Sequence, residues 1–265
     1  MTWLQVVVLA IVQGISEFLP ISSSGHLVLV PVAFGWSDQG LAFDVAVHFG
    51  SLIAVCLFFW DDIKAMIRGG VRLLGLKFDG PEATMALGIA LGTIPAAVAG
   101  LTMAGWIEAN LRDPSVIVFT LAGYGILMVV ADRLGKRDKN ISDIRLKHAF
   151  IIGCAQALAL IPGTSRSGVT ITAGRFLGFD RRDAARFSFL LSVPVILLAT
   201  IYEMGSLVMR DAVVPWAQFG VAVIVSAIVA YISIDFFMRF VTRIGLLPFA
   251  IYRIVLAAII LYLLV

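Results

Sequence analysis

The sequence is short of charge, of cysteine and of histidine. Asp, Glu, Lys and Arg together make up 14% of the 265 residues, whereas roughly 25% is ordinary for a soluble domain. That deficit excludes a cytosolic globular enzyme, a disordered chain and a nucleic-acid-binding protein, because each of these needs far more charge. The two cysteines, Cys56 and Cys154, both lie in apolar runs, so the sequence predicts neither a disulfide framework nor a zinc site.

Apolar residues take the place of the missing charge. They form 60% of the chain, and the mean hydropathy is +1.01. A membrane-spanning helix needs about 20 mostly apolar residues. Six stretches meet this requirement: 42–60, 83–105, 114–131, 184–203, 216–236 and 246–265. The sequence therefore predicts an all-α, polytopic integral membrane protein with six full transmembrane helices, in which residues 1–265 form a single membrane domain.

Two further apolar stretches, 3–34 and 148–178, are each interrupted by a cluster of Pro, Gly and Ser. The interruptions are Phe18–Gly25 and Ile161–Gly168. Only about 12–15 apolar residues remain on either side of each, which is too short to span a bilayer. A non-helical backbone at membrane depth is tolerated only where protein or a water-filled cavity surrounds it. We therefore expect each stretch to form a re-entrant helix pair.

The two broken stretches resemble each other. Gln13 precedes Gly25 by twelve residues, and Gln156 precedes Gly168 by the same number. Broken helices at corresponding positions in two halves of a chain are typical of inverted-topology repeats with a binding site near the bilayer midplane. We predict a first repeat at about 1–131 and a second at about 147–265. The alternative is that stretches rich in Ser and Gly look alike by composition alone.

Loop charges predict the orientation in the membrane. Of the 20 basic residues, 15 fall in loops on one side, which the positive-inside rule assigns to the cytoplasm. These loops are 61–80, 132–148, 178–186 and 237–245. The opposite side carries Arg112 and Arg210, and six crossings place both termini there as well. The remaining arginines, Arg166, Arg175 and Arg253, lie within apolar segments.

Polar groups inside a membrane are costly and indicate function. The two breaks and their flanks supply a set that suits phosphate: Gln13, Glu17, Ser22, Ser23, Ser24, His26, Gln156, Ser165, Arg166, Ser167, Gly168, Thr170 and Arg175. A Pro-Gly-Thr-Ser-Arg-Ser-Gly turn that opens a helix is expected to present backbone N–H groups and the positive end of the helix dipole to an anion. Arg166 adds bidentate hydrogen bonds to phosphate oxygens.

Glu17 is the strongest single candidate. It could act as a general base or as the ligand of a hard divalent cation, Mg²⁺ or Ca²⁺, that bridges substrate phosphates; the alternative is a structural ion pair with Arg166. We interpret His26 as a proton carrier or nucleophile, with simple packing as the alternative. One of the three consecutive serines could be a nucleophile activated by His26 or Glu17.

Other polar and small residues are interpreted mainly as architecture. Arg175 is a weaker candidate for the site, and the alternative is a side chain that snorkels to the membrane interface. Asp44 and His48 lie near a span end, where solvated roles prevail, although their spacing of four residues would let both face the cavity. Gly88 and Gly92 predict a close contact between two helices.

The stretch from Gln13 to His26, together with that from Pro162 to Thr170, resembles the bacterial undecaprenyl-diphosphate phosphatase family, also called bacitracin-resistance proteins. The resemblance covers essentially the whole chain. It implies hydrolysis of undecaprenyl diphosphate to undecaprenyl phosphate and inorganic phosphate, which recycles the lipid carrier for peptidoglycan synthesis and confers resistance to bacitracin. It also implies a divalent-cation requirement and a multi-pass location in the bacterial inner membrane, with the site toward the periplasm.

The resemblance also assigns roles to residues. It implies catalytic roles for Glu17, Ser23, His26 and Arg166, and Gln13 stands where some members carry a second Glu, which leaves Glu17 as the single acidic anchor. The expected partners are the diphosphate lipid and membrane lipids, without nucleic acid, and a homodimer stays open. The alternative function is a polyprenyl-phosphate flippase or a secondary transporter of a phosphorylated substrate, because inverted broken-helix repeats are also a transporter architecture.

Overall fold

The computed structural model describes residues 1–111, 113–209 and 215–264. Within those ranges the regular secondary structure is helical, and the only β-type pairing is an isolated bridge between Lys139 and Phe179. The predicted all-α class is therefore confirmed. Arg112 and Arg210, which the charge argument placed opposite the basic loops, lie outside the described residues.

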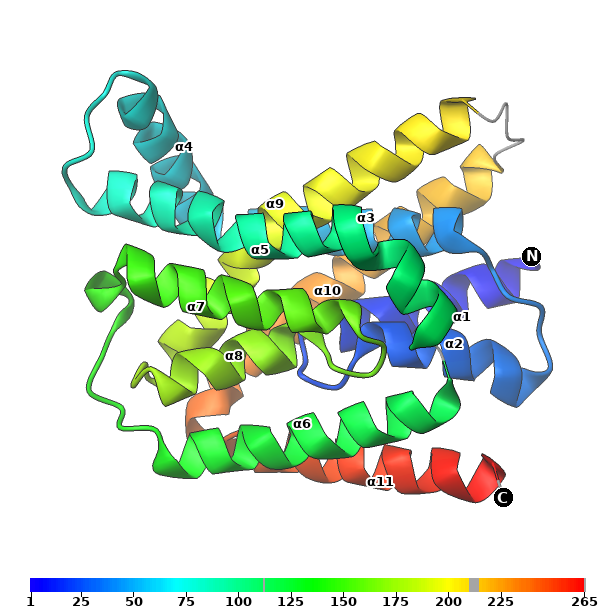
Figure 1. Ribbon diagram of the computed structural model, residues 1–265. Coiled ribbons are helices and arrows are strands. Elements are labelled where there is room, and N and C mark those ends of the chain that lie inside the picture. Colours follow the sequence, from blue (N-terminus) through cyan, green and yellow to red (C-terminus); the bar gives the residue numbers. More distant parts are fainter. Residues whose placement is uncertain (112, 210–214, 265) are drawn as a thin grey trace.

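The helices follow the hydropathy of the sequence closely (Figure 1). In chain order they are α1 (Trp3–Ser16), α2 (Ser23–Phe34), α3 (Leu41–Phe58), α4 (Trp60–Leu74), α5 (Pro81–Asn110), α6 (Pro114–Leu134), the 3₁₀ turn η1 (Ile141–Asp143), α7 (Leu146–Ala157), the 3₁₀ turn η2 (Leu158–Leu160), α8 (Arg166–Phe176), α9 (Arg181–Met209), α10 (Trp216–Ile244) and α11 (Leu247–Leu264). Pro81 and Pro114 each occupy the first turn of their helix, where a missing N–H costs no hydrogen bond.

Five helices in the described ranges, α3, α5, α6, α9 and α10, are long and apolar enough to cross a membrane. They coincide with five of the six predicted spans, so the chain is a multi-pass membrane protein. The sixth predicted span, 246–265, is α11, whose described residues form a shorter apolar helix. A sixth full crossing therefore stays a prediction.

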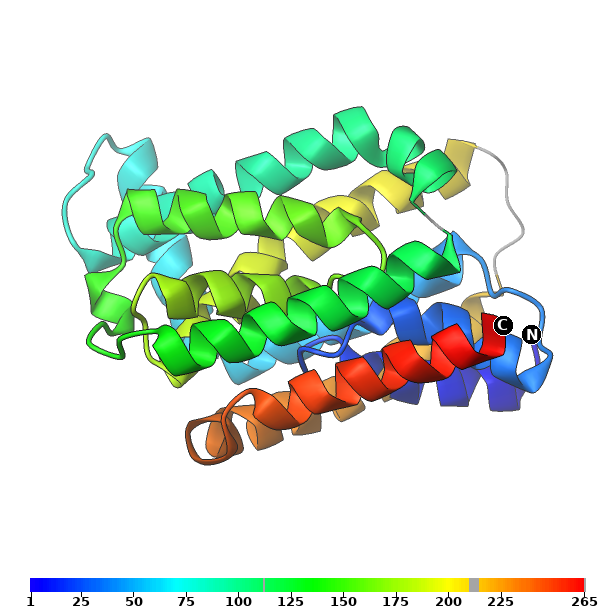
Figure 2. The same ribbon diagram turned by 60° about the horizontal axis from the view of Figure 1, so that its bottom comes forward.

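Both interrupted stretches break where the sequence predicts. The first consists of α1 and α2, and the second consists of α7, η2 and α8. The two connecting turns lie side by side in the middle of the molecule (Figures 1 and 2), and the hydroxyl of Ser167 donates a hydrogen bond to the carbonyl oxygen of Leu19 at 3.1 Å. Two turns that are about 150 residues apart in sequence thus meet in space.

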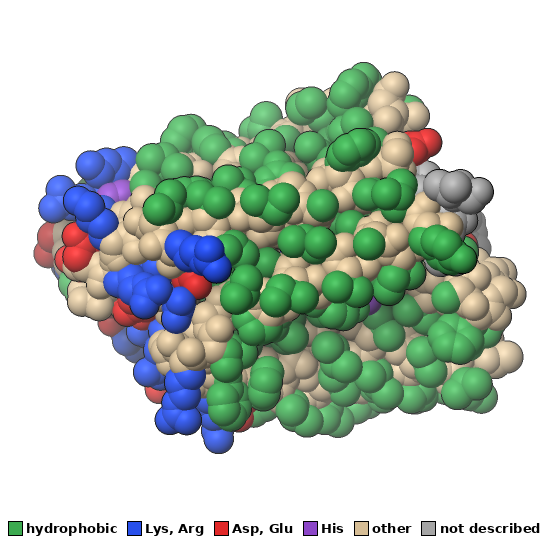
Figure 3. All heavy atoms as spheres, turned by 90° about the horizontal axis from the view of Figure 1, so that it is seen from below, with side chains coloured by type: hydrophobic (Ala, Val, Ile, Leu, Met, Phe, Trp, Pro, Cys, Tyr) green, Lys and Arg blue, Asp and Glu red, His purple; other side chains and the backbone are tan. Residues whose placement is uncertain are grey.

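Charge is concentrated at one end of the molecule. In Figure 3 the Lys and Arg side chains gather at one end, while hydrophobic side chains cover most of the remaining face. Both termini lie at the opposite end from this basic surface (Figures 1 and 2). This arrangement agrees with a chain whose basic loops share one side of the membrane and whose termini share the other.

At the basic end Arg175 is fully buried rather than snorkelling. Its Nε donates to Asp132 at 3.3 Å, and its Nη1 donates to the carbonyl oxygen of Phe179. The same carboxylate accepts a hydrogen bond from Arg181 at 2.7 Å. The alternative of a snorkelling side chain is therefore wrong, because a carboxylate 43 residues earlier in the chain supplies the partner that burial requires.

The predicted close contact at Gly92 is confirmed, and its partner is α7. A Cβ atom on Gly92 would lie 2.9 Å from the carbonyl oxygen of Ala149, and one on Gly153 would collide with the backbone of Gly92. Small residues thus let the backbones of α5 and α7 approach each other, as in other membrane helix pairs.

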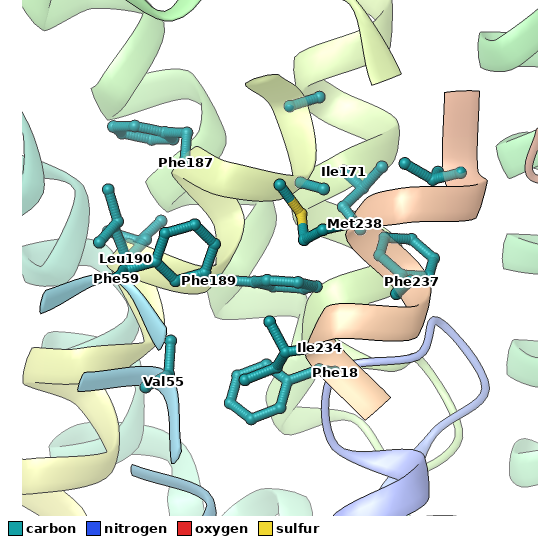
Figure 4. Close-up of a cluster of buried hydrophobic side chains, with 14 of the residues drawn as sticks. Phe18, Val55, Phe59, Ile171, Phe187, Phe189, Leu190, Ile234, Phe237 and Met238 are labelled. Carbon is teal, nitrogen blue, oxygen red and sulfur yellow. The ribbon is translucent and has the colours of Figure 1, made fainter. Parts of the chain in front are cut away.

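An aromatic cluster fills the space between the central turns and the basic end (Figure 4). The ring of Phe18 packs edge-on against that of Phe189, with ring centroids 5.0 Å apart. The centroid of Phe189 in turn lies 6.3 Å from that of Phe59 and 5.7 Å from that of Phe237. Phe18 directly follows Glu17, whereas Phe59 lines a cleft of about 990 Å³ at the basic end. The cluster therefore separates that cleft from the central turns.

Candidate active site

Each break contains one serine in the left-handed backbone region. Ser22 has φ 76° and Ser165 has φ 69°; in the described ranges the only other non-glycine residue with positive φ is Leu76. Such a conformation costs of the order of 1–3 kcal/mol and is concentrated at functional sites. Both serines directly precede a helix, because α2 begins at Ser23 and α8 at Arg166.

Arg253 of α11 ties the two turns together. Its side chain is buried, and it donates to the carbonyl oxygen of Pro20 in the first turn at 3.4 Å. It also donates to the carbonyl oxygens of Gly163 and Thr164 in the second turn, at 3.0 Å each. The sequence placed this arginine in an apolar segment without a role, and the structure gives it one: it satisfies carbonyl groups that non-helical backbone would otherwise leave unpaired.

Glu17 lies at the meeting point of the two broken stretches. Its side chain is only 5% exposed, and its Oε1 accepts a hydrogen bond from Nη2 of Arg166 at 3.0 Å. Its Oε2 accepts from the hydroxyl of Ser23 at 2.7 Å and from the amide of Gln13 at 3.1 Å. The ion pair with Arg166 and the contact with a potential nucleophile therefore coexist on one carboxylate.

A fourth group beside Glu17 is the imidazole of His48, so the alternative that the sequence left open, in which His48 and Asp44 face the cavity, is the one observed. The Nε2 of His48 lies 3.4 Å from Oε2 of Glu17, and its Nδ1 lies 2.6 Å from the carbonyl oxygen of Asp44. Because both neighbours are acceptors, the protonated ring donates from both nitrogens. The sequence favoured a solvated position near a span end for His48. It lies seven residues, or roughly 10 Å, inside α3, and the signal that could have found it is that depth in an apolar helix.

These groups line a cavity of about 550 Å³, a size typical of small-molecule sites. Its polar lining residues are Glu17, Ser23, Ser24, Asp38, Asp44, His48, Gln156, Ser165, Arg166 and Thr200. Apolar side chains complete the wall: Leu27, Val28, Leu41, Val45, Ala96, Ile117, Ala159, Leu160, Val195, Ile196 and Ala199. The cavity therefore combines polar groups from both breaks with a large apolar surface.

His26 does not join this group, contrary to our expectation of an imidazole from the first break. Its Nδ1 donates to the carbonyl oxygen of Ser22 at 2.7 Å, so Nε2 is left to accept from the hydroxyl of Tyr252 at 2.5 Å. The His26 ring also stacks on Tyr252, with ring centroids 5.6 Å apart. These two contacts turn the His26 ring toward α11 and away from the cavity. The imidazole that lines the cavity is that of His48.

Four other predicted residues hold the turns together rather than line the cavity. The N–H of Gly168 was expected to face an anion. It instead donates to the hydroxyl oxygen of Ser165 at 3.2 Å, and Ser165 thereby caps α8. Thr170 exchanges a 2.6 Å hydrogen bond with Ser188 of α9, Ser167 bonds across to the first turn, and the hydroxyl of Ser22 lies 3.5 Å from that of Ser24. These contacts fix the backbone that carries the lining residues.

The protein engages only part of the Arg166 guanidinium. Its Nη2 is bonded to Glu17 and its Nη1 to the carbonyl oxygen of Ser188 at 3.0 Å. Its buried Nε has no hydrogen-bond partner among the described residues. An unpaired guanidinium N–H beside a cavity is suited to an anionic oxygen.

The donor set favours a cation shared with a ligand over a site made by protein alone. The described ranges contain no group of three or more His, Cys, Asp and Glu side chains placed to hold a metal ion. Oε2 of Glu17 is already surrounded by Ser23, Gln13 and His48, whereas Oε1 receives only Arg166. Oε1 could therefore supply one ligand, and Mg²⁺ is commonly bound by one or two carboxylates together with substrate phosphates.

The profile of the family described as bacitracin resistance protein BacA matches residues 6–259. The chain belongs to this family. The match confirms the resemblance stated on the two motifs, and those motifs are the segments that the fold brings together around Glu17 and Arg166.

Curated relatives within the BacA family are similar over nearly their full length. A protein of Teredinibacter turnerae named undecaprenyl-diphosphatase is 51% identical over 256 residues, which are 97% of each chain. One of Hahella chejuensis with the same name is 50% identical over 259 residues, again 97% of each chain. A third, undecaprenyl-diphosphatase 2 of Stutzerimonas stutzeri, is 48% identical over 99% of this chain and 98% of its own.

Proposed function

We propose that this protein hydrolyses undecaprenyl diphosphate to undecaprenyl phosphate and inorganic phosphate. The reaction recycles the lipid carrier for peptidoglycan synthesis and confers bacitracin resistance. Membership of the BacA family and the names of its relatives support the proposal. The structural observation that carries it is the convergence of Glu17, Ser23 and Arg166, from two separate breaks, on one cavity.

In the proposed reaction Glu17 accepts the proton of the attacking hydroxyl. The 2.7 Å contact from Ser23 makes its oxygen one candidate nucleophile, and a water in the same place is the other. The attacking oxygen bonds to the terminal phosphorus while the bond from that phosphorus to the bridging oxygen breaks and undecaprenyl phosphate leaves. If Ser23 attacks, water then hydrolyses the phosphoserine. Arg166 stabilises the charge on the transferring group, on which phosphoryl transfer chiefly depends.

The remaining predicted residues have supporting roles in this proposal. Gln13 and Arg166 orient the carboxylate of Glu17. His26, through its bond to Ser22, fixes the first turn of α2, which carries Ser23 and Ser24. Ser165, Ser167, Gly168 and Thr170 fix the second turn and the start of α8, which carry Arg166.

We propose that the reaction uses a divalent cation, Mg²⁺ or Ca²⁺. Glu17 is the residue that would hold it, with oxygens of the substrate as further ligands. When bound, the cation would neutralise negative charge on the leaving phosphate. An oxygen-only ligand set of this kind suits both of these hard cations.

The proposed location is the bacterial inner membrane, with the cavity open toward the periplasm. The lining includes Asp38 and Leu41, which belong to the connection between α2 and α3 and to the start of α3, and this connection lies at the same end of the molecule as the termini (Figure 1). A cavity of about 550 Å³ holds the diphosphate and the first part of the prenyl chain, so the rest of the chain would extend among the membrane lipids. In the same proposal residues 1–265 form one domain of two inverted repeats, about 1–131 and 147–265.

The proposal is tested by measuring phosphate release from undecaprenyl diphosphate by detergent-purified protein. Removing a group that acts on the transferring phosphoryl costs about 10²–10³ in kcat, so we expect losses of that size in Glu17→Gln and Arg166→Ala. Asp235→Asn is the control, because its carboxylate is paired with Arg239 at 2.7 Å at the basic end. Rates close to that of the wild type in both site variants would refute the site.

The same protein in sealed vesicles distinguishes hydrolysis from the transport alternative. The broken helices are compatible with transport, but the packed rings of Phe18, Phe189 and Phe59 stand between Glu17 and the cleft at the basic end. With labelled diphosphate lipid we expect free phosphate without translocation. Translocation of intact lipid without phosphate would instead support a flippase, and cross-linking in the same vesicles would report a homodimer.

A further inference from the structure

The amide of Gln156 is an unused polar group in the wall of the cavity. The residue lies near the end of α7 and is 2% exposed, and its side chain lines the cavity together with Glu17 and Arg166. Within the described part of the chain, neither its Oε1 nor its Nε2 has a hydrogen-bond partner. Because buried polar groups are nearly always paired, an amide with both ends free indicates a ligand or an ordered water.

The corresponding residue of the first break shows what Gln156 lacks. Gln13 stands at the matching position and donates to Glu17, four residues later on the same helical face. Four residues after Gln156 the chain has Leu160, which cannot accept a hydrogen bond. The second break therefore provides the same amide without a neighbouring carboxylate. The amide is left to bond to a ligand that enters the cavity.

We propose that Gln156 is a substrate-binding residue whose N–H donates to a non-bridging oxygen of the diphosphate. Nε of Arg166, the other unpaired buried donor at this cavity, would bind the same anion. The amide oxygen of Gln156 would accept a hydrogen from a water that the diphosphate carries. This inference rests on the proposed function for the identity of the ligand, and it adds a contact from the second broken stretch.

A binding role and a packing role predict opposite changes. In Gln156→Leu an unpaired amide is replaced by an apolar group of similar size, so the melting temperature of the ligand-free protein should stay unchanged or rise by a few degrees. The KM for undecaprenyl diphosphate should rise about tenfold or more, because a hydrogen bond to a charged oxygen is lost, while kcat changes less. Gln156→Glu, which keeps the shape but replaces the donor by a negative oxygen, should raise KM at least as much.

Ser226→Ala is the matched control. Its hydroxyl is as deeply buried, but it is paired with the carbonyl oxygen of Val47 at 2.7 Å and lies outside the cavity lining. We expect a lower melting temperature and an unchanged KM. A lower melting temperature in Gln156→Leu together with an unchanged KM would overturn the proposal, and should that variant fail to fold, an unchanged KM in Gln156→Glu would do the same.

A thermal shift with inorganic pyrophosphate separates this inference from the proposed function, because it requires no turnover. We expect pyrophosphate to raise the melting temperature of the wild-type protein and of Ser226→Ala, and to have little effect on Gln156→Glu. If the wild type binds pyrophosphate but releases no phosphate from the lipid, the proposed hydrolysis fails while the binding role stands. Equal shifts in the wild type and Gln156→Glu would show that Gln156 does not bind the anion.

Discussion

At the residue scale, the site is a set of donors around one carboxylate. A buried carboxylate is tolerated only when its oxygens are paired, because desolvation of an isolated charge costs many kcal/mol. Glu17 meets this condition with Arg166, Ser23, Gln13 and His48. Three of the four donors come from outside α1, so the carboxylate is stable only when the broken stretches and α3 have assembled.

The contribution of His48 can be measured by substitution. His48→Leu removes the donor to Oε2, and we expect a roughly tenfold or larger loss in kcat/KM, since hydrogen bonds to charged groups contribute about 1.5–3 kcal/mol. His48→Gln places an amide nitrogen close to the position of Nε2 and should recover most of the activity. Steady-state phosphate release checks both variants. Equal losses in the two would mean that His48 acts through its ring and not as a donor to Glu17.

At the element scale, the broken helices are held in place by close backbone contacts and by the buried guanidinium of Arg253. Arg253 donates to carbonyl groups of both turns, and Gly153 lets α7 approach α5 at Gly92. In a bilayer there is little hydrophobic driving force between helices, so packing and hydrogen bonds have to hold the broken segments. The position of α7 matters for function because Gln156 and the second turn follow on the same segment.

Alanine substitutions at two glycines with different surroundings test this packing. Gly153→Ala puts a methyl group into the backbone of α5, and we expect it to lower the free energy of unfolding by about 1–3 kcal/mol. Gly100→Ala meets nothing within 4 Å on the exposed side of α5, so it should be neutral or stabilising by up to about 1 kcal/mol through helix propensity. Thermal or chemical unfolding in detergent gives both values. A Gly153→Ala protein as stable as Gly100→Ala would contradict the α5–α7 contact.

At the scale of the whole molecule, the distribution of charge predicts which end faces the cytoplasm. The basic surface gathers at one end and both termini lie at the other (Figures 1 and 3). From this distribution the positive-inside rule predicts a cytoplasmic basic end, and the proposed periplasmic position of the cavity follows from that prediction.

Cysteine labelling in intact cells tests that orientation. In a protein whose Cys56 and Cys154 are replaced by Ala, Ser37→Cys lies in the exposed loop before α3, and Lys136→Cys lies in an exposed basic loop. A membrane-impermeant maleimide that passes the outer membrane should label Ser37→Cys and should reach Lys136→Cys only after the cells are lysed. The reverse pattern would overturn the proposed orientation and with it the periplasmic site.

The sequence alone determined the membrane class, the positions of the five long apolar helices and the two breaks, whereas the amphipathic helix α4 lies in a stretch that was expected from the sequence to be a loop. Each depends on local properties: about 20 apolar residues favour a spanning helix, and a Pro/Gly/Ser cluster interrupts one. Glu17, Ser23 and Arg166 could be selected in the same way, because polar groups are rare in apolar segments. The family resemblance likewise depends only on the order of residues along the chain, and the inverted repeat stays a prediction from that order.

Only the tertiary structure decided which of these polar groups meet. It joined Arg166 to Glu17 across 149 positions of sequence and brought His48 to the site, while it turned His26 toward Tyr252. It also paired Arg175 with Asp132 at the basic end. Neither burial nor pairing is a local property, since both depend on how helices far apart in the chain pack against one another. That is why the composition of the site could be largely predicted and its geometry could not.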